Sequence, residues 1–508
     1  MGRSSTNFVR STLALMGAVS SWVGCGDDAA SGGAGGAGAA GAGPGAGAGS
    51  SIGGSGAGGE STTGGSGTGG GGTGGAAPGA CGVFTTFEDG KTPTTTLHVS
   101  TSGSDASGDG SSGSPFATIA RAVQEAAPGT AIEVHAGTYA GGLFFDGLAG
   151  TEAAPIWIGG AMGEAKPVLE GGGNALQLVR PRYVVLHDLE VRGSTANGIS
   201  VDDGGDYADP EAARYVVFRD LDIHDIGSNG NQDCLKLSGL NDFWVLRSSF
   251  ARCGGGASGS GVDHVGCHRG VLAENDFSDL STAGNAIQCK GGSEDLTIVA
   301  NEIRDGGARA INLGGSTGFE FFRPPLSPDA PNAEARRIHV IANVLVGSVA
   351  PIAFVGCVDC LAANNTIVAP ENWVVRILQE TVTGGGFTFE PASNGRFVNN
   401  VVFFELGGIS THVNVGANTQ PESFVFANNL WYAFDQPGSS APSLPVTETG
   451  GLVGVDPGFV DAASSDYHLG MGSPAIGAGA AVSELLGDKD GVCFLAPPSV
   501  GAYEGGAP

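Results

Sequence analysis

The chain has 508 residues, and its composition already excludes several classes of protein. Glycine fills 92 of the 508 positions, roughly 18 per cent, whereas its usual share is about 7 per cent. Charged residues make up 15 per cent, against about 25 per cent in typical domains. This combination argues against a helical protein with an ion-paired surface. Acidic residues outnumber basic ones by 51 to 23, and the net charge of −28 would repel nucleic acid, which we exclude as a partner. If the substrate is acidic, the same charge predicts a bridging divalent cation.

The N-terminal part predicts export. Residues 1–24 have the order of a signal peptide, with basic residues before an apolar run that is too short to span a membrane. The sequence Trp22-Val23-Gly24-Cys25-Gly26 resembles a bacterial lipoprotein box, which implies that Cys25 is lipidated after cleavage; free secretion is the alternative. Residues 25–80 are rich in Gly, Ala and Ser and are expected to be a disordered linker. We therefore expect an outer-membrane or cell-surface lipoprotein that touches the membrane only through its lipid and folds as a monomer over residues 81–508.

The remaining cysteines are consistent with an oxidising compartment. Eight of the nine follow Cys25, and this even number predicts disulfides whose pairing the sequence does not define. Cys357 and Cys360 are expected to form a local disulfide or to stay buried as thiols.

Internal repeats indicate the fold. A short motif recurs between residues 189 and 430 at steps of 22 to 42 residues, and each repeat holds short β-rich runs separated by turn residues. Steps near 22 to 28 residues fit one coil of a parallel β-solenoid, and longer steps are coils with an extruded loop. The recurring asparagine predicts a ladder of stacked amides between coils, formed by Asn275, Asn301, Asn343, Asn365, Asn400 and Asn428.

The two ends of the repeat region agree with this fold. Ser114 and Pro115 are expected to begin a helix over Phe116–Ala127 whose apolar face covers the open first coil. Several stretches resemble bacterial right-handed parallel β-helix proteins: Leu97–Asp105, Pro115–Ile119, Gly137–Tyr139, Asp456–Phe459 and Gly501–Glu504. The resemblance covers about residues 95–505 and implies an all-β, right-handed parallel β-helix with an N-terminal capping helix.

The register between neighbouring coils predicts which side chains face outward. The segment Ala286–Ser293 matches Ala310–Ser316 when Lys290 is treated as one inserted residue, a bulge that would turn its side chain into a groove. With the isoleucines facing inward, one outward column on successive coils comprises Lys236, Asp263, Gln288 and Asn312, and it is flanked by Asp233, Lys290 and Arg309.

Basic side chains beside outward carboxylates fit β-elimination from a uronate in an acidic polysaccharide. The C5 hydrogen of a uronate becomes removable when the sugar carboxylate is neutralised by a metal ion or an arginine. We expect Lys290 to be the base, Arg309 to hold the carboxylate, and Lys236 to belong to the same catalytic group. An ammonium near other cations has a pKa lowered from about 10.4 toward the working range. The alternative for each lysine is a solvated ion pair.

Carboxylate oxygens in this region predict a Ca²⁺ site. Asp233 and Asp263 are the expected ligands, and Asp202 and Asp203 would complete the site from the preceding coil, unless they form a solvated acidic turn.

These stretches also resemble β-helix polysaccharide lyases. Asn231–Leu237 looks like the Asn-Ala-Asp-Gly stretch of family 9 pectate lyases, which implies that Asp233 binds Ca²⁺, that Asp263 is a further ligand and that Lys290 is the base. Ile287–Ser293, followed by Arg309, resembles the Lys and Arg pair of the alginate and chondroitin lyases of the β-helix type.

Further residues are expected to contact the substrate. His264 and His268 follow the outward column, and Gln288 and Asn312 belong to it. The aromatic loop Gly318–Pro325 would either wall a groove and stack on sugar rings or pack on the β-helix, leaving Arg323 exposed.

Two other functions remain open from the sequence. A glycoside hydrolase would use outward carboxylates such as Asp233 and Asp263 on either side of the scissile bond. A non-catalytic surface protein would use the solenoid to bind a glycan, without a Ca²⁺ site and without loss of function when a single lysine is replaced.

Overall fold

The structure is a computed structural model that describes residues 81–227, 230–256 and 258–505. The signal peptide, Cys25 and the linker of residues 25–80 lie outside the described residues, so export and lipidation stay predictions. No helix in the described part of the chain combines the length and apolar character needed to cross a membrane.

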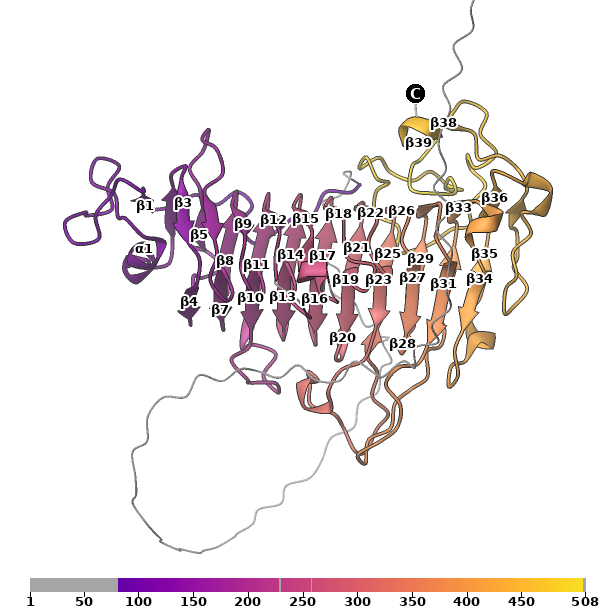
Figure 1. The fold of residues 1–508 in the computed structure, drawn as a ribbon, viewed down its shortest axis with the longest axis horizontal. Helices are drawn as coiled ribbons and strands as arrows, with labels where there is room; N and C mark the ends of the chain where they lie inside the picture. Colours follow the sequence, from indigo (N-terminus) through magenta and orange to yellow (C-terminus); the bar gives the residue numbers. More distant parts are fainter. Residues whose placement is uncertain (1–80, 228–229, 257, 506–508) are drawn as a thin grey trace, which may run out of the picture. The chain divides into compact units, whose positions relative to one another are not determined.

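Nearly all strands of the described chain belong to three long parallel sheets, as predicted. Successive coils place one strand after another in each sheet, so hydrogen-bonded neighbours are separated by a full coil of sequence (Figure 1). Sheet 1 contains β1 (Thr95–Val99), β2 (Thr130–Val134), β5 (Ile156–Gly160), β8 (Arg182–His187), β11 (Ala213–Arg219), β14 (Leu240–Leu246), β17 (His268–Ala273), β20 (Ser293–Glu294), β21 (Thr297–Val299), β24 (Ala335–Arg336), β25 (His339–Ile341), β28 (Cys357–Val358), β29 (Leu361–Ala363), β32 (Arg396–Val398) and β35 (Val425–Ala427).

The other two sheets run beside it. Sheet 2 contains β4 (Leu143–Asp146), β7 (Leu176–Val179), β10 (Ile199–Asp202), β13 (Leu235–Ser238), β16 (Ser260–Val265), β19 (Asn285–Lys290), β23 (Arg309–Gly314), β27 (Ala350–Val355), β31 (Trp373–Leu378) and β34 (Thr411–Val415). Sheet 3 contains β3 (Thr138–Ala140), β6 (Val168–Glu170), β9 (Glu190–Arg192), β12 (Asp222–His224), β15 (Ser249–Ala251), β18 (Asp276–Ser278), β22 (Glu302–Arg304), β26 (Val344–Val346), β30 (Thr366–Val368), β33 (Val401–Phe404), β36 (Leu430–Ala433) and β37 (Leu452–Val453). The tail adds an antiparallel pair, β38 (Phe459–Asp461) and β39 (Asp466–Leu469).

Inward side chains of equivalent position stack from coil to coil and fill the core. In sheet 2 one such column runs through Leu235, Val262, Ile287, Ile311, Ile352 and Val375, all fully buried. Because side chains alternate between the two faces of a strand, this inward column fixes which neighbours face outward.

The predicted asparagine ladder is present, with one error. Each ladder amide accepts a hydrogen bond from the backbone N–H of its counterpart on the preceding coil, as Asn343 does from Asn301 at 2.9 Å. The last position is Asn429, which accepts from the Asn400 N–H, and not Asn428, whose φ of 51° places it in the left-handed turn one residue earlier. The ladder ends where Glu448 accepts from the N–H of Asn429.

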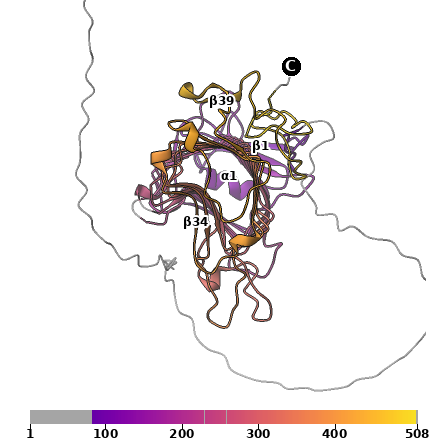
Figure 2. The same ribbon diagram turned by 90° about the vertical axis from the view of Figure 1, so that its right-hand side faces the viewer.

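The capping helix is shorter than predicted. Helix α1 (Ile119–Glu125) begins after Thr118, whose side chain accepts from the N–H of Arg121, and not after Ser114. Ile119 and Ala122 are buried in the core, and the helix lies within the outline of the coils when the molecule is viewed along its length (Figure 2). Phe116, predicted to be helical, instead pairs with Val99 and is buried.

Disulfides are present as expected from the cysteine count. Cys81 pairs with Cys493, Cys234 with Cys253, and Cys357 with Cys360, whereas Cys267 and Cys289 are buried thiols.

Candidate functional site

The predicted outward column exists on sheet 2. Strand pairing places Lys236 beside Asp263, Asp263 beside Gln288, and Gln288 beside Asn312 on successive coils. The column continues toward the N-terminus through Ser200 and Gln177 and toward the C-terminus through Ala353, Arg376 and Asn414. The result is a polar strip along the outer face of β7 to β34.

The centre of this strip is a compact group of two lysines and two aspartates. The Lys236 ammonium pairs with Asp263 Oδ2 and lies 3.4 Å from Asp233 Oδ2, while the Lys290 ammonium lies 3.6 Å from the same Asp263 oxygen. The carboxylates are essentially buried, whereas the Lys236 side chain is 15% exposed and that of Lys290 is 9% exposed. Both cations therefore reach the surface above a buried anionic base.

The pKa values of the two carboxyls are shifted in opposite directions. Burial raises the pKa of Asp233 to about 6, although the charge of Lys236 lowers it. Burial also raises the pKa of Asp263, but the charges of Lys236 and Lys290 outweigh this and hold it below its usual value of 3.8. Asp263 is therefore the charged partner that both lysines share.

Lys290 does not form the predicted bulge. It pairs with Val265 as the last residue of β19, in continuous parallel register, and β23 extends equally far to Gly314. Its ammonium reaches Asp263 from a regular strand position because outward side chains two residues apart along neighbouring strands lie close together.

Arg309 lies on the C-terminal side of the group, at the start of β23. It donates to Asn312 Oδ1 at 3.2 Å and pairs with Glu380. Gln288 accepts from Asn285 Nδ2 at 2.6 Å, and Asn312 also donates to the Gly314 carbonyl, so the amides of the column are fixed in orientation.

The predicted Ca²⁺ site does not fit these residues. The Lys236 ammonium lies between the carboxylates of Asp233 and Asp263, in the place where a shared cation would bind. With Lys290 as a second cation, the charges of the two carboxylates are already balanced, whereas Ca²⁺ requires six to eight oxygen ligands. Asp203 does not complete the set, because its carboxylate binds Arg323, and Asp202 accepts from Gln177 Nε2 at 3.0 Å.

His264 and His268 do not face the column, contrary to expectation. His264 is fully buried inside the solenoid, where it stacks on Phe243 and bonds the Gln288 carbonyl at 2.8 Å through Nδ1. His268 belongs to sheet 1, and its ring nitrogens bond Asn241 Oδ1 and the Gly292 carbonyl. Since strand residues alternate in direction, the inward position of His264 follows directly from the outward position of Asp263.

The aromatic loop packs against the protein. Arg323 is buried, although the sequence analysis expected it to be exposed. Phe319 and Phe322 contact Phe389, and Arg323 is 7% exposed, with its guanidinium on the carboxylate of Asp203. The loop passes beside Gly292, two residues after Lys290. It therefore borders the strip, and its buried arginine is not available as a substrate contact.

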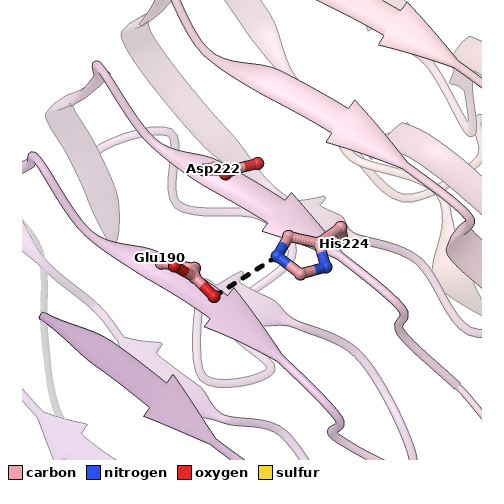
Figure 3. A group of neighbouring side chains, drawn as sticks. All are labelled: Glu190, Asp222 and His224. Carbon is pink, nitrogen blue, oxygen red and sulfur yellow. Dashed lines mark ion pairs between the residues drawn. The ribbon is translucent and has the colours of Figure 1, made fainter. Parts of the chain in front are cut away.

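A group of potential metal ligands lies on a different face. Glu190, Asp222 and His224 project from β9 and β12 of sheet 3 (Figure 3). Each offers one potential ligand atom, and these three atoms lie within 4.8 Å of one another. Arg192 donates to Glu190 at 3.0 Å, and His224 bonds Asp225. The guanidinium of Arg192 is therefore already bound to the Glu190 carboxylate. This group lies on sheet 3 and is separate from the strip on sheet 2.

Two residues of the strip were not anticipated from the sequence. Trp373 and Arg376 project from β31, and the Arg376 guanidinium lies over the indole ring at 4.2 Å. Trp373-Val-Val-Arg376-Ile-Leu has the same spacing as Arg309-Ala-Ile-Asn312-Leu-Gly, and extending the coil register by two repeats would have found them.

Comparison with known proteins agrees with this architecture. Residues 174–323 match the family model described as the right handed beta helix region. The fold is a right-handed parallel β-helix. Residues 101–143 match a further model, described as a protein of unknown function (DUF1565), and no curated protein matches the chain.

Solved structures similar to this β-helix include polysaccharide lyases and glycoside hydrolases. A pectate lyase is 15% identical with a TM-score of 0.48, covering 82% of this chain and 97% of its own. An alginate lyase from Paenibacillus is 16% identical with a TM-score of 0.38, covering 65% and 99%. A glycoside hydrolase is 11% identical with a TM-score of 0.46, covering 66% and 96%. At these identities the likeness concerns the fold alone.

Proposed function

We propose that the protein is an exported lyase that cleaves an acidic, uronate-containing polysaccharide by β-elimination on the polar strip of sheet 2. The observation that carries this proposal is the sharing of Asp263 Oδ2 by the ammoniums of Lys236 and Lys290, with Arg309 on the same face. In a chain of net charge −28, this gathering of cations on one face matches a substrate that carries carboxylates.

The arrangement supplies the groups that elimination needs. Lys290, in its neutral form, removes the C5 proton, and the electron pair forms the C4–C5 double bond as the C4–O bond breaks. The leaving oxygen takes a proton from Lys236, which lies against both Asp233 and Asp263, whereas Lys290 reaches Asp263 alone, at 3.6 Å. Arg309 stabilises the charge that develops on the uronate carboxylate.

Charge neutralisation by side chains removes the need for Ca²⁺. Lys236 lies where the metal would bind, and Arg309 supplies the positive charge that a metal would bring to the sugar carboxylate. The reaction is therefore expected to proceed in the presence of a chelator.

A glycoside hydrolase is the second candidate, and one observation favours it. Asp233 and Asp263 lie on either side of Lys236 and have pKa values displaced in opposite directions, as an acid and a base in one site require. Both carboxyls are buried beneath the lysines, however, which leaves the cations closer to a substrate.

The test is incubation of the purified protein with pectate, alginate and chondroitin while the absorbance of unsaturated uronate is followed. Lys290→Ala should lower the rate by at least about 10²-fold, as expected for loss of a general base. Lys489→Ala, a lysine outside the strip, serves as the matched control and should retain full activity. Unsaturated product formed at the full rate by Lys290→Ala would contradict the assignment. Binding of a glycan without any cleavage would favour a non-catalytic surface protein.

A further inference from the structure

Arg376 differs from nearly all other arginines of the protein in its partners. Within the part of the chain that the structure describes, every arginine except Arg182 and Arg376 forms an ion pair with a carboxylate. Arg182 is exposed on sheet 1, whereas Arg376 is half-buried on the polar strip of sheet 2. An acidic protein has thus left one partly desolvated guanidinium without an anion.

The surroundings of Arg376 fix its orientation. Nε donates to Asn414 Oδ1 at 3.0 Å, and the guanidinium stacks on Trp373 at 4.2 Å. Glu380, the nearby carboxylate, pairs with Arg309 instead. Among the described residues no acceptor is found for the two Nη groups, so the fork that binds carboxylates in a bidentate manner is held in place with its donors available.

Burial and the nearby charge of Arg309 lower the pKa of Arg376 below its usual value, while Glu380 raises it. An anion at the Nη groups would offset both unfavourable effects. The site therefore gains from binding a negative charge, independently of any contact that Lys290 or Lys236 makes.

The position of Arg376 on the strip is informative. It is two coils beyond Asn312, and Ala353 occupies the coil between them. Coils are spaced by about 4.8 Å, the distance between hydrogen-bonded strands. A polysaccharide lying along the solenoid could therefore have one sugar at Arg309 and another at Arg376.

We propose that Arg376, oriented by Trp373 and Asn414, is a second carboxylate-binding subsite that holds another acidic sugar of the same chain. This inference rests on the proposed function and narrows its substrate class to polymers with several uronates close together, bound along the solenoid axis. Arg376 is a substrate-binding residue here, and Trp373 is a positioning residue.

The test combines binding and kinetics. Calorimetric titration of Lys290→Ala and of Lys290→Ala with Arg376→Gln would use saturated oligogalacturonate, oligomannuronate and chondroitin oligosaccharides, each also in carboxyl-esterified form. Loss of a charge-assisted bidentate contact should weaken binding of the acidic oligomer at least about tenfold and leave the esterified form within about twofold. Arg376→Lys should recover part of the loss, and Arg182→Gln, the matched control, should change nothing.

Kinetics separate this inference from the proposed function. In a protein with the native Lys290, Arg376→Gln should raise KM about tenfold with little change in kcat, because the residue is remote from the reacting bond. Cleavage by wild type with KM and affinity unchanged in Arg376→Gln would overturn the subsite and leave the lyase proposal intact. Weaker binding in Arg376→Gln without any unsaturated product from wild type would do the reverse. If wild type binds none of the acidic oligomers, both are wrong.

Discussion

The buried His264 should make the protein sensitive to mild acid. Burial inside the solenoid lowers the pKa of its imidazole from 6.5 to about 4, although the hydrogen bond to the Gln288 carbonyl raises it. Above about pH 6.5 the ring is neutral in the folded and unfolded states, and stability is complete. As the pH falls toward 4, the unfolded chain takes up a proton that the folded chain cannot, so stability is lost. The interval of 2.5 units (6.5 minus 4) corresponds to about 3 kcal/mol.

The perturbation that isolates this effect is His264→Leu. The leucine keeps the site filled and removes Nε2, which has no hydrogen-bond partner in the structure, at the expense of the Nδ1 contacts with the Gln288 carbonyl and with Cys289 Sγ. Urea unfolding followed by circular dichroism at pH 7 and at pH 4.5 should show a small change at pH 7 and a clearly smaller loss in acid than wild type. His468 lies on the surface, and although partial burial lowers its pKa, the carboxylates of Asp466 and Asp490 raise it, so His468→Leu should lose at least as much stability in acid as wild type does. An equal acid-induced loss in His264→Leu and wild type would refute this reasoning.

Three further outcomes follow from the structure. Asn343→Ala removes five hydrogen bonds of 2.9 to 3.0 Å from the buried ladder and should lower the free energy of unfolding by about 3–5 kcal/mol in urea titrations. Asn428→Ala removes one bond to the Ala478 carbonyl and should lower it by about 1 kcal/mol or less. Equal losses in the two variants would contradict the corrected register of the ladder. The rate of cleavage of an acidic polysaccharide should be unchanged in excess EDTA. Loss of activity that added Ca²⁺ reverses would show that the reaction requires the metal. Cys81→Ser opens a bridge between residues 412 apart in sequence and should lower thermal stability by the equivalent of about 2–4 kcal/mol, which scanning calorimetry would measure; an unchanged transition would show that the bridge adds nothing.

The fold could be predicted because the repeating coils of a solenoid require a periodic sequence. Every coil must present apolar side chains to the same core, so Ile287 and Ile311 identify the register by themselves, and the outward neighbours Gln288 and Asn312 follow. The ladder error at Asn428 has a local cause. Paired asparagines place their first member in the left-handed turn and their second in the ladder, as the positive φ of Asn399 ahead of Asn400 also shows.

The candidate site was predicted less completely, since part of it depends on contacts that register does not describe. The pair of Arg323 with Asp203 joins residues 120 apart through a loop that folds back along the coils, and no repeat pattern indicates it. The position of the Lys236 ammonium between two buried carboxylates likewise depends on side-chain conformation, so the residue types alone suggested a metal site. His264 is different, because strict alternation along β16 would have placed it inside.

The central claim is that the polar strip carries out elimination. The most direct measurement is the mass of the products formed from an acidic polysaccharide in water enriched in heavy oxygen. Elimination adds no water, so the account predicts unsaturated, unlabelled products whose formation Lys290→Ala suppresses. Saturated products, heavier by one water than the unsaturated ones, would contradict it and would favour the hydrolase.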